Sequence, residues 1–182
     1  MYLENVQILG DHLKYEPTSL VKHSWANLPR FLAGFRASPK TDPNEKHNAF
    51  SHFALDCDCG SSTWHIRGYR PEPKLVLCPL SLECSKCGRC RMLFDIERHG
   101  YDAELGNGCF SRRLEGQEVA YQCVKCEGRV FSATAVVSYQ MEEEDVDDEM
   151  RPKLQDLFDT FALHVVCLAC ARYATICDYE CA

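Results

Sequence analysis

Several features that would assign this chain to a common class are missing from its sequence. No apolar run approaches the roughly 20 residues that a membrane-spanning helix needs. The first residues, MYLENVQILGDHLKYE, contain early acids and lack the basic start of a secretory signal peptide. We therefore expect a cytoplasmic protein that makes no contact with a membrane.

Signatures of catalysis are also absent. The sequence contains no HExxH, no HxE followed by PCxxC, no GxxxxGK[ST] and no GxGxxG. Its seven histidines are scattered along the chain. His99 and Asp102 are close enough in sequence to form a local pair, although a lone histidine in a loop is more often structural. The sequence thus predicts a protein that is not an enzyme.

Cysteine, by contrast, is abundant: the chain has 13, an odd number. A reducing cytosol argues against a disulfide framework, so metal ligation is the leading explanation. Four isolated cysteines suit a different role, as small apolar residues of a core. They are Cys78, Cys109, Cys177 and Cys181.

The other cysteines form four closely spaced groups, each between two segments rich in β-branched and aromatic residues. Such segments favour strands, so the pattern of strand, cysteine group and strand occurs four times. The groups are Cys57/Cys59, Cys84/Cys87/Cys90, Cys123/Cys126 and Cys167/Cys170. A tight turn between two strands directs two thiolates at one point, which is half of a tetrahedral four-cysteine site.

Because zinc takes four ligands, the turns must associate in pairs. Sequential pairing leaves 24 residues between Cys59 and Cys84, and 40 between Cys126 and Cys167. The sequence therefore predicts two structural Zn²⁺ ions per chain. The ligands of the first are Cys57, Cys59, Cys84 and Cys87, and those of the second are Cys123, Cys126, Cys167 and Cys170.

These motifs resemble the zinc-ribbon superfamily, whose sites are built from two zinc knuckles on β-hairpins. The resemblance covers roughly residues 50–95 and 118–180. CVKC…CLAC matches the pattern well, whereas CDCG…CSKC departs from it, since only one residue separates its first two thiols. This departure leaves Cys90 and His65 as alternatives to Cys59 in the first ligand set.

Two other uses of clustered cysteines remain as alternatives. A redox CxxC needs one motif at a helix start, where the helix dipole lowers a thiol pKa, but these motifs lie between strands and come in sets. Cys84, Cys87 and Cys90 have the CxxCxxC spacing of ferredoxins, yet the usual fourth cysteine followed by proline is not found downstream.

The expected fold is α+β and β-rich, with two antiparallel zinc-ribbon-like units. We expect an irregular, partly helical region at 1–50 that packs on the rest, with a loop at 38–48. The first unit spans 51–115, and the second spans 116–182 with an acidic loop and a helix. Leu154, Leu157, Phe158 and Phe161 recur at helical spacing, which predicts an amphipathic helix near 150–161.

The net charge of −7 comes from the C-terminal part of the chain. Residues 1–50 carry +1, residues 51–115 carry zero and residues 116–182 carry −8, including seven acids within 142–149. This sign is wrong for a general nucleic-acid binder, because phosphate contacts dominate that affinity. It suits a basic protein partner, which such a surface attracts by electrostatic steering.

The hypothesis is thus a zinc-stabilised, non-enzymatic interaction protein, such as an acidic inhibitor of the immunity type or an adaptor. One alternative is a nucleic-acid-binding ribbon with a basic and aromatic surface. That surface would consist of Arg67, Arg70, Lys86, Arg89 and Arg91 with Trp64 and Tyr69. The other alternative is a zinc hydrolase with an open coordination position.

Overall fold

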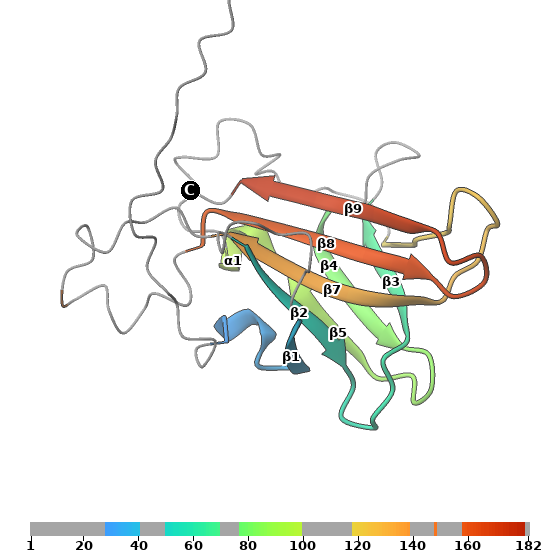
Figure 1. Ribbon diagram of the computed structural model, residues 1–182, viewed down its shortest axis with the longest axis horizontal. Coiled ribbons are helices and arrows are strands. Elements are labelled where there is room, and N and C mark those ends of the chain that lie inside the picture. The colour runs from blue at the N-terminus through green and yellow to red at the C-terminus, as the bar shows by residue number, and fades with distance from the viewer. Residues whose placement is uncertain are drawn as a thin grey trace, which may run out of the picture.

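The computed structural model describes residues 28–40, 50–69, 77–99, 118–138, 148 and 158–180. These residues form one antiparallel sheet with two short helical turns (Figure 1). The strands are β1 (Arg36–Lys40), β2 (Phe50–Asp56), β3 (Trp64–Tyr69), β4 (Leu77–Cys84), β5 (Cys90–Phe94), β6 (Val119–Ala120), β7 (Phe131–Ser138), β8 (Thr160–Cys167) and β9 (Tyr173–Glu180). The turns are η1 (Arg30–Leu32) and α1 (Ile96–His99). Among the described residues, no helix has the length and apolarity to cross a membrane.

The strands predicted beside the cysteine groups are all present. Strands β2, β4, β6 and β8 lead into the four groups, and β3, β5, β7 and β9 follow them. The prediction of a β-rich antiparallel protein is therefore confirmed. Strand β1 was not predicted, and it includes Ser38 at the start of the expected loop at 38–48. Its Pro39 is tolerated because β1 is an edge strand, which pairs with β2 alone.

The predicted helix near 150–161 is not supported. Residues 149–157 lie outside the described part, but Thr160 and Phe161 already belong to β8. Phe161, Leu163 and Val165 alternate along this strand and are all buried. Phe161, the last residue of the helical pattern, is instead placed by the pairing of β8 with β7 and β9.

The sheet has two wings that curl over a common core. One wing is β1-β2-β7-β8-β9 and the other is β6-β3-β4-β5, and they join where Trp64 of β3 lies opposite Phe131 of β7. Phe94 of β5 stacks on Phe161 of β8 with ring centroids 4.1 Å apart, although these strands are not neighbours in the sheet. The wings therefore face each other across the core. The division into 1–50, 51–115 and 116–182 stays a prediction, but strands from either side of residue 115 pair directly.

The two cysteine-bearing halves, β2–β5 and β6–β9, repeat the same pairings. In the first half Trp64 lies opposite Cys84, and in the second half Phe131 lies opposite Cys167. The β4–β5 pair has a register shift after Leu80, and the β8–β9 pair has one after Leu163. Each shift lies four residues before the cysteine that ends its strand.

Contacts between the halves follow the same symmetry. Strand β2 pairs with β7 through Ala54 and Thr134, and β6 pairs with β3 through Ala120 and Arg67. Directly opposite residues of an antiparallel pair are related by a local twofold axis. The halves are therefore related by an approximate twofold axis that passes between Trp64 and Phe131. In Figure 1 the β6–β7 and β8–β9 turns of the second half lie at the right, and the β2–β3 and β4–β5 turns of the first half lie lower in the view.

Candidate metal centres

The three CxxC turns share one backbone design. The N–H of the first cysteine donates to the carbonyl five residues on, and its own carbonyl accepts from the N–H four residues on. For Cys84 these partners are Arg89 and Gly88, both at 2.9 Å. The same bonds join Cys123 to Gly128 and Glu127, and Cys167 to Arg172 and Ala171. Each turn is therefore held in shape by backbone groups that flank the two thiols.

The CxC turn is a shorter version of this design. Cys57 donates to the carbonyl of Ser61 at 2.7 Å, and Gly60 donates to the carbonyl of Cys57 at 2.8 Å. Each bond spans one residue fewer than in a CxxC turn. The missing residue between the thiols is thus absorbed by a tighter loop, and both sulfurs still project from the turn.

All four turns end in the same backbone conformation. The residue directly after the second cysteine has a positive φ: 81° at Gly60, 70° at Gly88, 58° at Glu127 and 55° at Ala171. This left-handed region is free of cost for glycine but disfavoured for other residues. The first half meets the requirement with glycine, and the second half accepts strain at Glu127 and Ala171.

The turns meet in pairs and form two clusters of four sulfurs. The first cluster is Cys57, Cys59, Cys84 and Cys87, and the second cluster is Cys123, Cys126, Cys167 and Cys170. Within each cluster every sulfur lies within 4.8 Å of the others. In the first cluster Cys57–Cys87 and Cys59–Cys84 are each separated by 3.6 Å. The corresponding separations in the second cluster are 3.7 and 3.5 Å.

These separations fit a metal better than a disulfide. A disulfide joins sulfurs at about 2.05 Å, and all eight cysteines are free. Four sulfurs at about 2.3 Å from a central zinc define a tetrahedron whose edge is about 3.8 Å. The closest pairs in both clusters approach that edge. The donor set and its spacing therefore suit one tetrahedral divalent ion in each cluster.

The thiols of the second cluster ionise unequally. The backbone N–H of Lys125 lowers the pKa of Cys123, burial raises it, and further hydrogen bonds bring it down to about 6. The N–H of Gly128 lowers the pKa of Cys126, but the neighbouring Cys170 thiol and burial raise it to about 12. One thiolate in the cluster therefore disfavours a second.

The first cluster behaves in the same way. Burial raises the pKa of Cys84, but the N–H groups of Cys87 and Lys86 and the adjacent thiols lower it to about 6. The N–H of Cys59 lowers the pKa of Cys57, but burial and the Cys87 thiol raise it to about 11. Full ionisation of four adjacent thiols requires a cation among them. A divalent metal supplies that charge.

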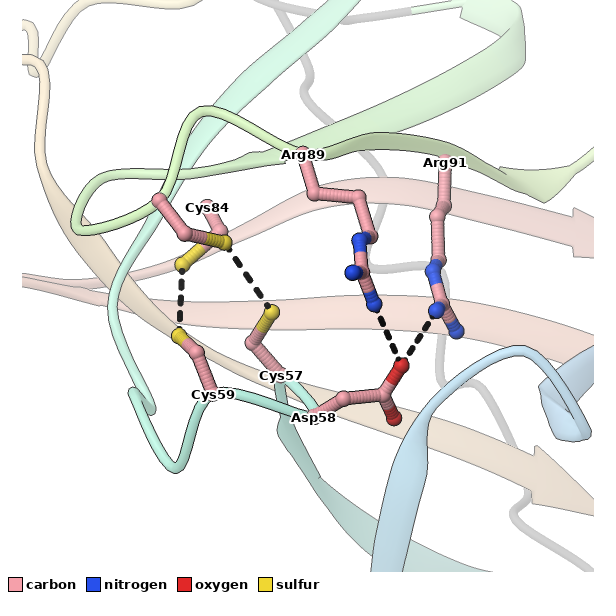
Figure 2. A network of polar contacts seen from close by, with 7 residues as sticks. Cys57, Asp58, Cys59, Cys84, Arg89 and Arg91 are labelled. Carbon is pink, nitrogen blue, oxygen red and sulfur yellow. Dashed lines mark hydrogen bonds and ion pairs between the residues drawn. The ribbon is translucent and has the colours of Figure 1, made fainter.

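Charged side chains connect the two turns of the first cluster. The carboxylate of Asp58, between the two cysteines of the CxC turn, accepts from Arg89 at 2.7 Å and from Arg91 (Figure 2). Hydroxyl groups connect the same turns on another side, since Thr63 bonds both Ser61 and Ser85. The first cluster is thus bridged by polar contacts that do not depend on metal.

The second cluster has different side chains at the matching positions. The equivalents of Thr63 and Ser85 are Val130 and Leu168, and Arg91 corresponds to Ala174, so the same bridges cannot form. Val124 and Leu168 are exposed apolar residues beside its cysteines. Space is tight here, because a Cβ on Gly128 would lie 3.0 Å from the sulfur of Cys167 and 3.2 Å from that of Cys126. Gly128 is therefore needed for the close approach of the two turns.

The structure brings together all eight cysteines of the predicted ligand sets. Cys59 lies in the first cluster, while the alternatives Cys90 and His65 lie outside it. Cys90 begins β5 opposite Glu83, and His65 donates through Nδ1 to the carbonyl of Arg129 at 2.9 Å. Cys177 is buried in the core, as expected for an isolated cysteine. The side chain of Cys78, and all of Cys109 and Cys181, lie outside the described residues.

The predicted basic and aromatic surface lacks Trp64, and three of its arginines are paired with carboxylates. Trp64 is 1% exposed and its indole donates to the carbonyl of Leu55, so it cannot stack on a base. Arg67 pairs with Glu83 at 2.6 Å, and Arg89 and Arg91 pair with Asp58. Arg70 lies outside the described residues.

The motif around His99 has a structural role where it is described. His99 accepts from the N–H of Asp95 through Nδ1 at 3.0 Å and packs against Phe31 and Phe94. Its proposed partner Asp102 lies outside the described residues.

Sequence reasoning missed the roles of Asp58 and Gly128. The bridge across the first cluster could have been predicted from the sequence, because Asp58 lies inside CDC and Arg89 and Arg91 follow CSKC. No local pattern indicated the close approach at Gly128, which depends on the pairing of two distant turns.

Comparisons with known proteins identify no relative: no family model, curated protein or solved structure matches the chain. The resemblance to zinc ribbons therefore remains one of turn geometry and ligand type.

Proposed function

We propose that this chain is a non-enzymatic interaction protein whose fold is stabilised by two structural zinc ions. The observation that carries the proposal is the pair of four-sulfur clusters, with nearest sulfurs 3.5–3.7 Å apart. Tetrahedral sets of four thiolates are characteristic of zinc, which is bound without redox change. Each ion would join two turns that are distant in sequence.

A structural role follows from the number of ligands. Catalytic zinc keeps one position for water or substrate, whereas four cysteines close the coordination sphere. Each cluster offers four sulfurs, two of them from buried cysteines. This favours structural sites over the hydrolase alternative.

The interaction partner is proposed to be a basic protein. Support comes from the charge of −8 in residues 116–182 and from the seven acids in 142–149. Of this run only Asp148 belongs to the described residues, where it lies in a turn. Nucleic acid is a weaker candidate, because Trp64 is buried and Arg67, Arg89 and Arg91 are paired with carboxylates.

Metal analysis of the purified chain tests the structural proposal. We expect two zinc ions per chain and loss of cooperative folding when a strong chelator removes them. Structural zinc contributes about 10–16 kcal/mol in small finger peptides, which is comparable with the net stability of a whole domain. One zinc per chain would contradict the first site, and iron would point to a different metal chemistry.

Paired cysteine variants supply the control. Cys123→Ser removes a ligand of the second cluster and should cause loss of metal and misfolding. Cys90→Ser changes a cysteine outside both clusters and should keep two zinc ions and the native fold. Native folding of Cys123→Ser would overturn the assignment of the second site.

A further inference from the structure

We propose that the two metal sites bind cooperatively, so that an ion in one cluster raises the affinity of the other. The inference rests on the proposed zinc sites and concerns how they act together. Its basis is a buried row of four residues that runs across the sheet from one cluster to the other, here called the central row. The central row is Cys84, Trp64, Phe131 and Cys167.

The central row is continuous. Cys84 lies opposite Trp64, Trp64 opposite Phe131, and Phe131 opposite Cys167, on four successive strands. All four residues are 1% exposed. Side chains of directly opposite residues share a face of the sheet and are in contact range. The ends of the row are ligands of the first and second clusters, three strand spacings or about 14 Å apart.

Each aromatic residue of the row also contacts the segment that leads into the other turn of its own cluster. Trp64 donates from its indole to the carbonyl of Leu55 at 2.8 Å, and Leu55 is two residues ahead of Cys57. The ring of Phe131 packs on Tyr121 with centroids 5.2 Å apart, and Tyr121 is two residues ahead of Cys123. The positions of Trp64 and Phe131 therefore each depend on both turns of one cluster.

Backbone bonds strengthen this link at both ends. Ser85, next to Cys84, donates to the carbonyl of Thr63, next to Trp64, at 3.0 Å. Leu168, next to Cys167, donates to the carbonyl of Val130, next to Phe131, also at 3.0 Å. An ion that draws the turns of one cluster together thus fixes the strand segment that carries the row aromatic.

The position of one aromatic then restricts the other. Trp64 and Phe131 pack in a core where a shift of one large side chain requires a shift of its neighbour. Ordering the first cluster orders Trp64, and Trp64 holds Phe131 in the place that the second cluster needs. Part of the entropy cost of ordering the second cluster is then already met before the second ion binds. The second ion therefore binds more tightly, which is positive cooperativity. Electrostatic repulsion between the two charged sites would oppose this cooperativity. Their separation exceeds the Debye length of about 8 Å at physiological salt, so the repulsion is screened.

The test measures zinc affinity by chelator competition on the full metal-free chain. Wild type gives the overall constant for two ions, and Cys126→Ser and Cys59→Ser give the constants of the first and second sites alone. The coupling factor is the overall constant divided by the product of the two single-site constants. We expect a factor of about 10 or more, within the usual range of about 5–150 for coupled sites. A factor of one or less would overturn the proposal.

A matched pair of variants tests the path. Phe131→Leu changes the central row, while Phe161→Leu makes the same change in β8, six residues from Cys167, at a side chain that is also fully buried. We expect the coupling factor to fall severalfold in Phe131→Leu and to be retained in Phe161→Leu. Equal loss in both would mean that coupling reflects overall stability and not the central row.

If a single-site variant misfolds and binds no zinc at all, it gives no single-site constant, and the test then depends on the phenylalanine variants alone. The two phenylalanine variants are then compared on the eight-cysteine chain by native mass spectrometry at one equivalent of zinc. Singly loaded chains should increase in Phe131→Leu and not in Phe161→Leu, and the reverse would contradict the row. Failure of wild type to bind two ions is a distinct result, which refutes the proposed metal sites themselves.

Discussion

Ala171 and Glu127 are held in a backbone conformation that glycine adopts without strain. They follow the second cysteine of their turns, with φ of 55° and 58°, where the first half has Gly88 and Gly60. The left-handed region costs a residue with a Cβ roughly 1–2 kcal/mol. The cysteine turns of the second half therefore carry local strain that pairing of the turns must offset.

This strain leads to a prediction at the scale of one residue. Ala171→Gly should stabilise the zinc-loaded protein by about 0.5–1 kcal/mol, since relief of strain exceeds the added flexibility of the unfolded chain. Chemical denaturation of the loaded protein measures the change. Ala169→Gly is the control: it lies in the same turn without a positive φ and should be neutral or destabilising. Equal effects of the two variants would argue against strain at Ala171.

The thiol pKa values predict how zinc affinity depends on pH. At pH 7 Cys84 and Cys123, with pKa values of about 6, are mainly thiolates, whereas Cys57 at about 11 and Cys126 at about 12 keep their protons. Zinc must displace those protons, so affinity should rise between pH 6.5 and 8.5 by at least about tenfold per unit for each ion.

Below pH 6 the dependence should become steeper, because Cys84 and Cys123 are then protonated as well. Competition titrations across this range, with proton release followed in weak buffer, provide the measurement. An affinity that does not change with pH would show that zinc is not bound by these thiolates.

At the scale of elements, the turns of the first cluster are joined by Asp58. Its carboxylate accepts from Arg89 and Arg91, which lie at the far end of the CSKC turn and in β5. Asp58→Asn keeps the size of the side chain and removes its charge. Partly exposed ion pairs contribute about 0.2–1 kcal/mol each, so zinc should leave the first site a few times faster.

The loss rate of zinc to an excess of chelator measures this effect, and it should shrink in high salt because ion pairs are screened. Glu83→Gln is the matched control. It removes the pair with Arg67, which joins β3 to β4 without linking the CxC turn to the CSKC turn. Faster zinc loss in Glu83→Gln than in Asp58→Asn would refute the bridging role of Asp58.

The strand pairs explain why local patterns identified most elements but not all. Segments rich in β-branched and aromatic residues before and after the cysteines correctly predicted β2 to β9 in outline. Around Phe158 and Phe161 the same chain satisfied a helical pattern, and the tertiary pairing of β8 with β7 decided the outcome. A short apolar segment can fit both the helical and the strand periodicity, and the strands that pair with it decide which one forms.

At the scale of the whole molecule, the acidic C-terminal part is predicted to steer a basic partner. The acids to be replaced by Ser or Gln are Glu142, Glu143, Glu144, Asp145, Asp147, Asp148 and Glu149. Replacement should slow association with the copurified partner several-fold and affect dissociation less. The wild-type association rate should also fall as salt rises.

Stopped-flow or surface-based kinetics at several salt concentrations give both rates. Replacing Glu118 and Asp178, exposed acids of the same half but outside the run, is the control and should change association little. An association rate that ignores salt, or is unchanged in the neutralised run, would remove the acidic docking role and leave the zinc sites standing.

The sequence alone determined the cysteine turns and indicated how they group. A CxxC or CxC turn places two sulfurs together through bonds that span only three to five residues, so its geometry is encoded locally. The need for four ligands then indicated which turns associate, and all eight cysteines are where this reasoning placed them.

Only the tertiary structure decided how the two halves join. Pairing of β3 with β7 depends on backbone hydrogen bonds, which carry little information about the sequence of the partner strand. Trp64, which the sequence alone also allowed on a binding surface, is buried in the core, and this pairing aligns it with Phe131 between the clusters. The proposed link between the two candidate metal sites would therefore be a property of long-range packing, because no local segment contains both of its ends.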